Sequence, residues 1–251
     1  MKLTVIATGS TGNCYVLEGR RSALILEAGV PPEKMMAGTT LDMTKVAGVL
    51  LTHEHRDHAA FAARYAQLGL PLYCSTGTWA CLSLPAGARC ELLHNLEWRT
   101  DIADFEVLPF RTQHDAAEPF GYVIKHKELG TLVFLTDSRP IPYSFKTMKP
   151  DHIMVEANFD DGLLDDNVVA GEIDQAQATR VRSSHLSIRE AMELVRANET
   201  ASLKTVTLIH LSSRNADRLG FQKRMQDAVL FADVRAPRPG DVIYMNGRTE
   251  L

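Results

Sequence analysis

The sequence predicts a mixed α/β fold of the α+β type, in which two β-sheets carry helices on their outer faces within one domain over residues 1–251. Short runs rich in Val, Ile, Leu, Phe or Tyr alternate with turn signals, and helical stretches are added mainly in the second half. No repeat, low-complexity tract or long Gly/Ser linker divides the chain. A length of 251 residues is ample for one large core.

Apolar and β-branched runs bounded by turn residues predict the strands in order. They are 3–8, 14–17, 23–27, 46–52, 70–75, 105–110, 121–125, 131–136, 152–156, 205–210 and 242–245. Helices are predicted over 59–68, 187–197 and 214–230. In the second of these, Ile188, Met192 and Val195 recur at helical spacing.

The composition is that of an ordinary globular protein, with 45% hydrophobic and 23% charged residues and a net charge of −4. That charge gives no global indication of nucleic-acid binding, and no apolar run is long enough to span a membrane. The first residues enter a strand pattern and lack a secretory signal. The four cysteines form no C-x-x-C pair, so we expect reduced thiols and a cytoplasmic protein.

The most informative segment is Thr-His-Glu-His-Arg-Asp-His at residues 52–58, directly after the apolar run 46–51. Ionisable side chains at the end of a buried strand are costly to desolvate, and a bound metal ion would offset that cost. His53 and His55 lie on one face of an extended segment. Asp57 and His58 would face a second ion if the chain turns there into the helix predicted from Ala59.

Three further strands are followed by possible ligands, namely His114, Asp137 and His210. If these strand ends meet, imidazole and carboxylate groups gather at one edge of a sheet, without any thiolate. Such N/O ligands suit Zn²⁺, Mn²⁺ or Fe, so the sequence predicts a metal site. The remaining His94, His126 and His152 are interpreted as ordinary surface or core residues.

These residues carry a resemblance to a known family. The pattern His53-x-His55-x-Asp57-His58 resembles the signature of the metallo-β-lactamase superfamily, whose fold is a four-layer αββα sandwich. Residues 8–13 and 113–122 are similar to segments of its YycJ/WalJ branch, single-domain proteins linked to exonuclease activity on DNA. Matching segments at 135–137, 155–158, 184–187 and 210–212 follow in the same order.

The resemblance implies two metal ions. His53, His55 and His114 would hold the first, Asp57, His58 and His210 the second, and Asp137 would bridge them. Two positions depart from the family pattern. Glu27 stands where members usually carry an Asp that orients a ligand or its loop, and Phe159 stands where the branch tends to carry His.

Two neighbouring cations lower the pKa of a shared water, generate hydroxide at neutral pH and stabilise charge at the attacked centre. Asp57, as a ligand, is therefore expected to be essential for catalysis. His185 lies outside the ligand set and is the candidate general acid, or a phosphate contact. Its alternative interpretation is a helix-entry residue, with Ser184 or Ser187 as the cap.

Charge is distributed unevenly in the second half. Residues 155–175 contain seven acidic side chains and no Lys or Arg, whereas residues 180–238 contain eleven basic side chains and six acidic ones. Two solvated faces would explain this pattern. Alternatively, Arg182 and Arg214, with Arg180 and Arg218, bind phosphates. Ser184 and Asn13, the latter in a glycine-containing loop, are further candidates for phosphate contact.

We therefore predict a dinuclear metal-dependent phosphodiesterase, a DNA exonuclease with two Zn²⁺ or Mn²⁺ ions, or Fe, and with DNA favoured over RNA as substrate. The first alternative is a metal-dependent hydrolase of a cyclic nucleotide, lactone or thioester, which would need a closed pocket. The second is a metal-stabilised binding module without turnover. No membrane partner is expected.

Overall fold

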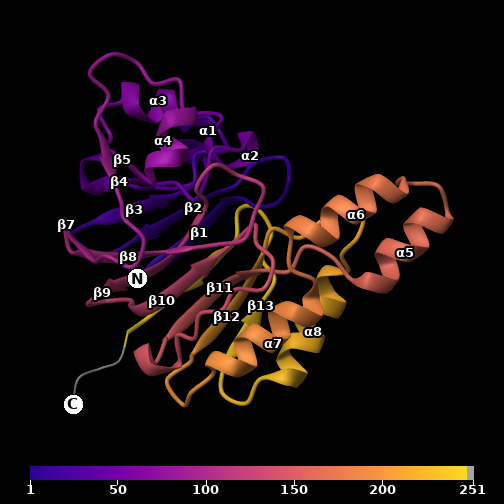
Figure 1. Ribbon diagram of the computed structural model, residues 1–251. Coiled ribbons are helices and arrows are strands. Elements are labelled where there is room, and N and C mark those ends of the chain that lie inside the picture. Colours follow the sequence, from indigo (N-terminus) through magenta and orange to yellow (C-terminus); the bar gives the residue numbers. More distant parts are fainter. Residues whose placement is uncertain (248–251) are drawn as a thin grey trace. The chain divides into compact units, whose positions relative to one another are not determined.

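A computed structural model describes residues 1–247 of this protein, so residues 248–251 of the predicted domain lie outside the described part (Figure 1). The chain forms two compact units. Unit 1 comprises residues 1–111 and 116–130 and the chain from Arg238 onward, and unit 2 comprises residues 112–115 and 131–237. A single domain stays a prediction.

Unit 1 contains a seven-stranded sheet in the order β14-β1-β2-β3-β4-β5-β6. Its strands are β1 (Lys2–Ala7), β2 (Cys14–Glu18), β3 (Ala23–Leu26), β4 (Val46–Leu50), β5 (Leu72–Cys74), β6 (Cys90–Leu92) and β14 (Val242–Tyr244). The strands from β14 to β3 pair antiparallel, and those from β3 to β6 pair parallel. The parallel strands therefore end at a common edge, where β3 is followed by Glu27 and β4 by the histidine-rich segment.

The helices of unit 1 are α1 (Pro32–Ala37), α2 (Arg56–Ala59), α3 (Ala62–Gln67) and α4 (Thr76–Cys81), with a 3₁₀ turn at Met43–Lys45. Met35 of α1 and Tyr65 of α3 are buried in one core with Val49 and Leu72 of the sheet. The single helix predicted over 59–68 is wrong, because the chain forms two helices there, α2 and α3. The backbone N–H of Phe61 donates to the carbonyl of Ala28 at 3.0 Å, which ends α2 and starts α3 in a new direction.

Three antiparallel strands complete unit 1, namely β7 (Arg99–Ile102), β8 (Phe105–Arg111) and β9 (Phe120–His126). They fix the segment that follows β4. The hydroxyl of Tyr122 donates to the carbonyl of Leu51. The backbone N–H of Phe120 donates to the carbonyl of Thr52 at 3.0 Å. Both bonds satisfy backbone groups that β4 leaves open where it ends.

Unit 2 is built on parallel strands in the order β13-β12-β11-β10. They are β10 (Gly130–Leu135), β11 (His152–Glu156), β12 (Thr205–Ile209) and β13 (Asp233–Arg235). All residues of β11 and β12 are buried, as expected for central parallel strands covered on both faces. Asp137 follows β10, Glu156 ends β11 and His210 follows β12.

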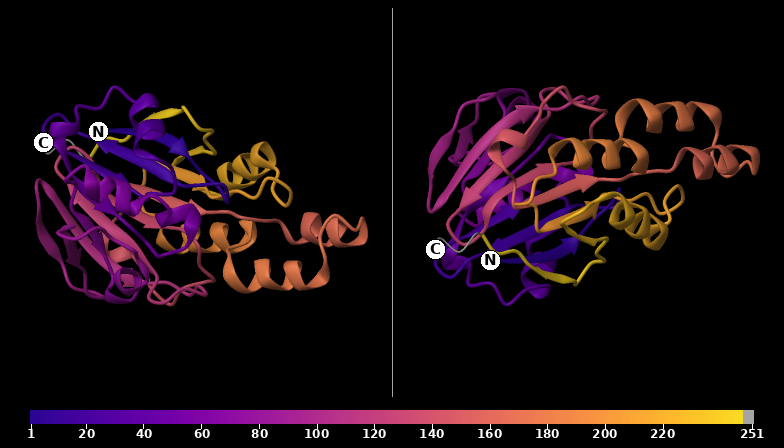
Figure 2. Two further views of the ribbon diagram at one scale, coloured as in Figure 1. Left: turned by 90° about the horizontal axis from the view of Figure 1, so that it is seen from above. Right: turned by 90° about the horizontal axis from the view of Figure 1, so that it is seen from below.

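The helices of unit 2 are α5 (Asp161–Val169), α6 (Gln175–Ser184), α7 (Ile188–Asn198) and α8 (Arg218–Ala228), with a 3₁₀ turn at Lys146–Met148. Helices α7 and α8 lie beside the strands of their unit, whereas α5 and α6 form a pair that projects away from them (Figures 1 and 2). Within residues 1–247, no helix is both long enough and apolar enough to cross a membrane.

All predicted strands are present, with ends that differ by one to two residues at most positions. The short strands β6, β7 and β13 and the helices α1, α4, α5 and α6 were not predicted. Helix α7 confirms the prediction over 187–197, with Ser187 as its N-cap. The helix predicted over 214–230 begins only at Arg218. Helices α5 and α6 show little apolar periodicity, because Leu164 and Ala178 are almost their only buried apolar residues.

Gly48 lies in β4, where a side chain has no room. A Cβ atom there would lie 2.5 Å from Cε2 of Tyr73 and 2.7 Å from the carbonyl oxygen of Pro71, the acceptor that pairs β4 with β5. We expect Gly48→Ala to lower the free energy of unfolding in urea by about 1–3 kcal/mol. Gly162→Ala in α5, whose Cβ would meet only the flexible Asp160 carboxylate at 3.1 Å, is the control. Equal urea midpoints for the two variants would contradict the clash.

Candidate metal centre

In unit 1 the histidine-rich segment packs as a cluster of rings. His53 and His58 are almost fully buried, and His55 lies just before α2. The ring of His53 lies 4.7 Å from that of His55 and 4.3 Å from that of His58, measured between centroids. The turn into α2 places Asp57 against this cluster, because its Oδ2 lies 3.2 Å from Nε2 of His58. The predicted grouping of His53, His55, Asp57 and His58 is therefore present within unit 1.

A buried carboxylate orients His58. Glu27 is fully buried, and its Oε1 lies 3.5 Å from Nδ1 of His58. Its Oε2 accepts a hydrogen bond from the backbone N–H of Thr52 at 3.4 Å. With Nδ1 turned toward Glu27, Nε2 of His58 faces Asp57, which is how an outer carboxylate orients a metal-binding imidazole. The side chain of Glu27 is thus long enough to reach the histidine.

Asn13 ties the loop after β1 to the same segment. Its backbone N–H donates to the carbonyl of Asp57 at 2.7 Å, and its amide Nδ2 donates to that carbonyl at 3.3 Å. Its Oδ1 accepts from the backbone N–H of Gly9 at 2.9 Å. The structure places this amide, buried, against Asp57, and its predicted phosphate contact stays a prediction.

In unit 2 a second group of possible ligands surrounds Asp137. Nδ1 of His114 donates to the carbonyl of Ser184 at 3.0 Å, which leaves Nε2 as the ligand atom, 3.7 Å from Oδ2 of Asp137. Nδ1 of His210 lies 3.4 Å from Oδ1 of Asp137. Asn158 supports His210 through contacts of its Nδ2 with Nδ1 at 3.2 Å and with the carbonyl at 3.0 Å.

The prediction of site residues missed Glu156, which is fully buried at the end of β11. Its Oε1 lies 2.6 Å from Nδ1 of His185 and 3.1 Å from Nδ1 of His210. Its Oε2 accepts from the backbone N–H of Ser138 at 3.1 Å. Its position at a strand end, like that of Asp137 and His210, was the signal that could have identified it.

The electrostatics of unit 2 follow from burial and from Glu156. Burial raises the pKa of Glu156, but the charge of His185 and the hydrogen bonds from His185 and His210 outweigh it, so that this pKa lies below its ordinary value. Burial lowers the pKa of His185, yet the adjacent Glu156 raises it above the ordinary value. For His114 burial prevails over the attraction of Asp137, and the pKa is lowered. A lowered pKa keeps His114 neutral, the form that binds metal.

These donors fit a divalent cation. One ligand atom from each of Asp137, Glu156, His185 and His210 can be chosen so that all lie within 4.8 Å of one another, and Asp137 and His210 are the predicted ligands among them. The 3.7 Å between His114 and Asp137 is too long for a hydrogen bond. It is close to the roughly 3.4 Å between neighbouring ligands of a tetrahedral zinc ion. Unit 1 supplies the same kinds of donor, imidazole nitrogen and carboxylate oxygen.

His185 is the C-cap residue of α6 and remains partly accessible, with 19% of its side chain exposed. Its ring stacks on that of His210 at 5.5 Å. Ser187, and not His185 or Ser184, caps α7, in a capping box with Glu190. Ser184 is buried and contributes its backbone carbonyl to His114. The cap predicted as Ser184 or Ser187 is therefore Ser187, and the role of His185 stays a prediction.

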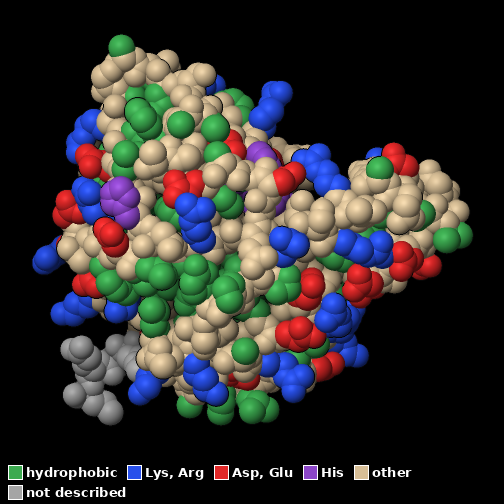
Figure 3. Space-filling model, in the orientation of Figure 1, with side chains coloured by type: hydrophobic (Ala, Val, Ile, Leu, Met, Phe, Trp, Pro, Cys, Tyr) green, Lys and Arg blue, Asp and Glu red, His purple; other side chains and the backbone are tan. Residues whose placement is uncertain are grey.

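The arginines of unit 2 have local partners. Arg182 contacts Asp161 at 3.4 Å and Asp165 at 2.6 Å, which links α6 to α5. The guanidinium of Arg214 donates to the carbonyl of Glu172 at 3.3 Å, and that of Arg180 lies 3.6 Å from Asp115. Basic and acidic side chains accordingly alternate over α5 to α8 in Figure 3. On this face the basic third of the sequence forms a mixed surface.

Phe159, which stands where the resembling branch tends to carry His, has a packing role. It is buried with Leu164 of α5, with Ala178 of α6 and with Ile173 between the two helices. Its carbonyl also accepts from the backbone N–H of Ile188 at 2.8 Å, at the start of α7. The ring thus anchors the α5–α6 pair on the rest of unit 2.

Comparison with known proteins agrees with this geometry. Residues 30–211 match the profile of a family described as "Beta-lactamase superfamily domain". Exodeoxyribonuclease YycJ of Bacillus anthracis is 29% identical over 150 residues, 55% of this chain and 54%, about half, of that relative. Exodeoxyribonuclease WalJ of Streptococcus pneumoniae is 26% identical over 230 residues, 85% of this chain and 82% of the relative.

Among solved structures, the metallo-β-lactamase fold protein YhfI from Bacillus subtilis superposes with a TM-score of 0.74 at 19% identity. The superposition covers 96% of this chain and 98% of YhfI. This likeness confirms the predicted fold class.

Gly29 gives a structural test of the segment 53–58, which we call the ligand loop because it carries four of the proposed ligands. A Cβ atom there would lie 1.8 Å from the carbonyl oxygen of Asp57 and 2.5 Å from the backbone nitrogen of Asn13. Because backbone cannot yield as a flexible side chain can, we expect Gly29→Ala to displace Asp57 and His58 and to lower bound metal by half or more. Elemental analysis of protein purified without chelator, with Gly162→Ala as control, measures this. Unchanged metal content in folded Gly29→Ala would contradict the placement of this loop.

Proposed function

This chain belongs to the β-lactamase superfamily of metal-dependent hydrolases, and we propose that its substrate is DNA, which it degrades as an exonuclease. The observation that carries the proposal is the set of buried imidazoles and carboxylates at the strand ends of each unit. The relatives YycJ and WalJ, both named exodeoxyribonucleases, support DNA rather than RNA as substrate. We also propose that the protein is cytoplasmic, as the sequence predicts.

We assign the ligands as the sequence resemblance implies. His53, His55 and His114 hold one ion, Asp57, His58 and His210 hold a second, and Asp137 bridges the two. Within unit 1 the contacts among His53, His58 and Asp57 support this assignment, and within unit 2 those of Asp137 with His114 and His210. Two divalent ions such as Zn²⁺ or Mn²⁺ would supply a water of lowered pKa and stabilise charge on the phosphate.

His185 is the proposed proton donor to the departing sugar oxygen. Glu156 holds its Nδ1–H at 2.6 Å, which fixes the ring and leaves Nε2–H for the substrate. The adjacent Glu156 raises the pKa of His185, which favours the protonated imidazole that a general acid requires. Glu156 is thus a positioning residue that acts through His185.

A change of His185 to Asn separates the possible roles. An alkoxide is a poor leaving group that needs a proton, whereas p-nitrophenolate leaves without one. We expect His185→Asn to lower kcat on DNA by about a hundredfold and kcat on bis-p-nitrophenyl phosphate far less, with metal content unchanged. His94→Asn, at an exposed histidine, is the control. Loss of metal would make His185 a ligand, and an equal loss on both substrates would make it a phosphate contact.

DNA binding is tested through its dependence on salt. Each phosphate contact contributes a slope of about −0.7 to −0.9 to log K against log salt. We propose that Arg182 and Arg214 make such contacts, so that Arg182→Ala or Arg214→Ala flattens the slope by roughly one unit, equally for different sequences. Arg235→Ala, an exposed arginine of β13 paired with Asp233, is the control.

The binding measurement uses the catalytically impaired Asp57→Asn variant and a fluorescent duplex. In parallel, the wild type should degrade end-labelled linear DNA and leave closed circular DNA intact. Good turnover of an uncharged lactone or thioester, without detectable DNA binding at low salt, would contradict the nuclease and favour a small-substrate hydrolase.

A further inference from the structure

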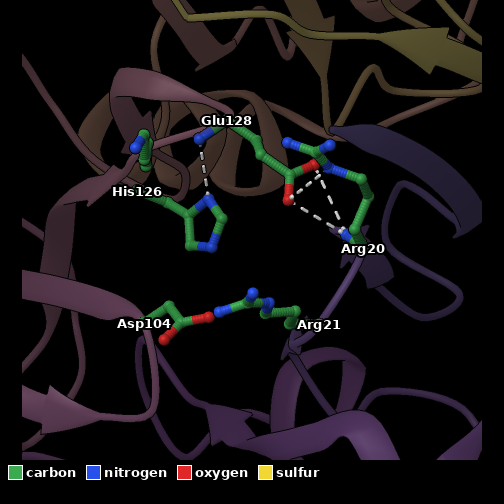
Figure 4. Close-up of a pocket in the computed structure, with 6 residues that line it drawn as sticks. Arg20, Arg21, Asp104, His126 and Glu128 are labelled. Atoms are coloured by element: carbon green, nitrogen blue, oxygen red, sulfur yellow. Dashed lines mark hydrogen bonds and ion pairs between the residues drawn. The ribbon is translucent and has the colours of Figure 1, made fainter.

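Unit 1 contains a cavity of about 480 Å³ that none of the proposed metal ligands lines. It is formed where three connections come together, after β2, between β7 and β8, and after β9. The lining residues are Arg20, Arg21, Asp104, His126, Lys127 and Glu128 (Figure 4). Its volume is within the range of ligand-binding sites in proteins.

The cavity lies at the far end of the sheet from the ligand loop of the same unit. Arg21 stands two residues before β3 begins, whereas Glu27 follows the end of that strand. Six residues of extended chain span roughly 20 Å. A molecule in the cavity therefore contacts neither His53 nor His58, and the cavity is a separate site.

The charges around the cavity leave a positive excess. Glu128 is occupied by Arg20, since its carboxylate accepts from the backbone N–H of Arg20 at 3.2 Å and lies 3.4 Å from the guanidinium. Arg21 and Lys127 are exposed, and over residues 1–247 neither has a salt bridge within 4.0 Å. Against these two cations stands only Asp104, which accepts from the hydroxyl of Ser22 at 3.4 Å.

His126 adds a donor of defined direction. Its ring is buried and packs on Phe105 at 4.7 Å, and Nδ1 accepts the backbone N–H of Glu128 at 3.0 Å. The proton of the neutral ring must therefore be on Nε2, and burial, by lowering the pKa, favours that neutral form. Figure 4 shows the ring in the space between the Arg20–Glu128 pair and the side chains of Arg21 and Asp104. The contact of Nε2 with Ser22, at 3.5 Å, is a weak one.

We propose that this cavity binds a small phosphate-bearing anion. Arg21 and Lys127 contact its oxygens, and Nε2–H of His126 donates to it from the buried side. Phosphate suits the site better than a carboxylate, because several oxygens can receive donors that arrive from different connections, and arginine binds two of them at once. Free phosphate and a mononucleotide share this chemistry.

The experiment is a titration followed by NMR of the histidine rings in the zinc-loaded protein. Inorganic phosphate, deoxyadenosine 5′-monophosphate and deoxyadenosine are added at constant ionic strength. His126→Gln assigns the His126 signal. We expect a saturable shift of this signal with phosphate, and an increase in Kd of about tenfold or more in the double variant Arg21→Gln/Lys127→Gln. Lys34→Gln/Arg89→Gln, which removes two exposed cations elsewhere in unit 1, should leave Kd unchanged.

The three titrations identify the ligand and can overturn the proposal. Tighter binding of the nucleotide than of phosphate supports a mononucleotide site, and equal binding supports a site for free phosphate. Shifts confined to the histidines of the metal segment, or an unchanged Kd in the double variant, would overturn it. So would an equal response to deoxyadenosine, which has no phosphate. The readout is binding alone, so a failure here leaves the proposed nuclease activity untouched.

Discussion

Two fully buried glutamates, Glu27 in unit 1 and Glu156 in unit 2, contact histidines of the proposed metal centre and its proposed proton donor. A carboxylate in the interior costs several kcal/mol unless it is paired and hydrogen-bonded. Glu156 accepts hydrogen bonds from the backbone N–H of Ser138 and from His185 and His210. Glu27 accepts one from the backbone N–H of Thr52, and its Oε1, 3.5 Å from Nδ1 of His58, has no hydrogen bond within residues 1–247. For Glu156 the pairing is mutual, so the contacts that make its buried charge tolerable also set the positions of His185 and His210.

The backbone shows a related constraint. Glu27, Asp137 and His210 each follow a strand and each has a positive φ, of 68°, 45° and 53°. Residues with a Cβ atom adopt this left-handed conformation at a cost of about 1 kcal/mol or more. Glycine would relieve it but would bring no side chain. This conformation thus falls at three ionisable residues of the candidate metal centre.

The α5–α6 pair is held together by ion pairs and apolar contacts. Arg182 bonds to Asp161 and Asp165, while Phe159 packs beneath the helices with Leu164 and Ala178. Residues 160–184 carry six acidic and two basic side chains, so the pair as a whole repels phosphate. The phosphate contacts that we propose are therefore few, namely Arg182, which also pairs with Asp161 and Asp165, and Arg214, four residues after His210.

The sequence by itself determined the long apolar strands, helix α7 and the residues that end the strands, because these features are written in local periodicity and in the H-x-H-x-D-H spacing. It did not determine the break between α2 and α3, which depends on a hydrogen bond from Phe61 to Ala28, thirty-three residues earlier. Nor did it reveal α5 and α6, which have little apolar periodicity and are held by Phe159 and by ion pairs.

The same division applies to the site. Residue types and spacing predicted the proposed ligands, but only the tertiary structure showed that Glu156 contacts His185 and His210, or that Asn13 bonds to Gly9 and Asp57. The cavity around His126 is a further example, since its walls come from three connections that are far apart in the chain. The physical reason is common to all of them. A hydrogen bond or ion pair between distant residues depends on where folding brings the two groups, and local sequence contains no record of that distance.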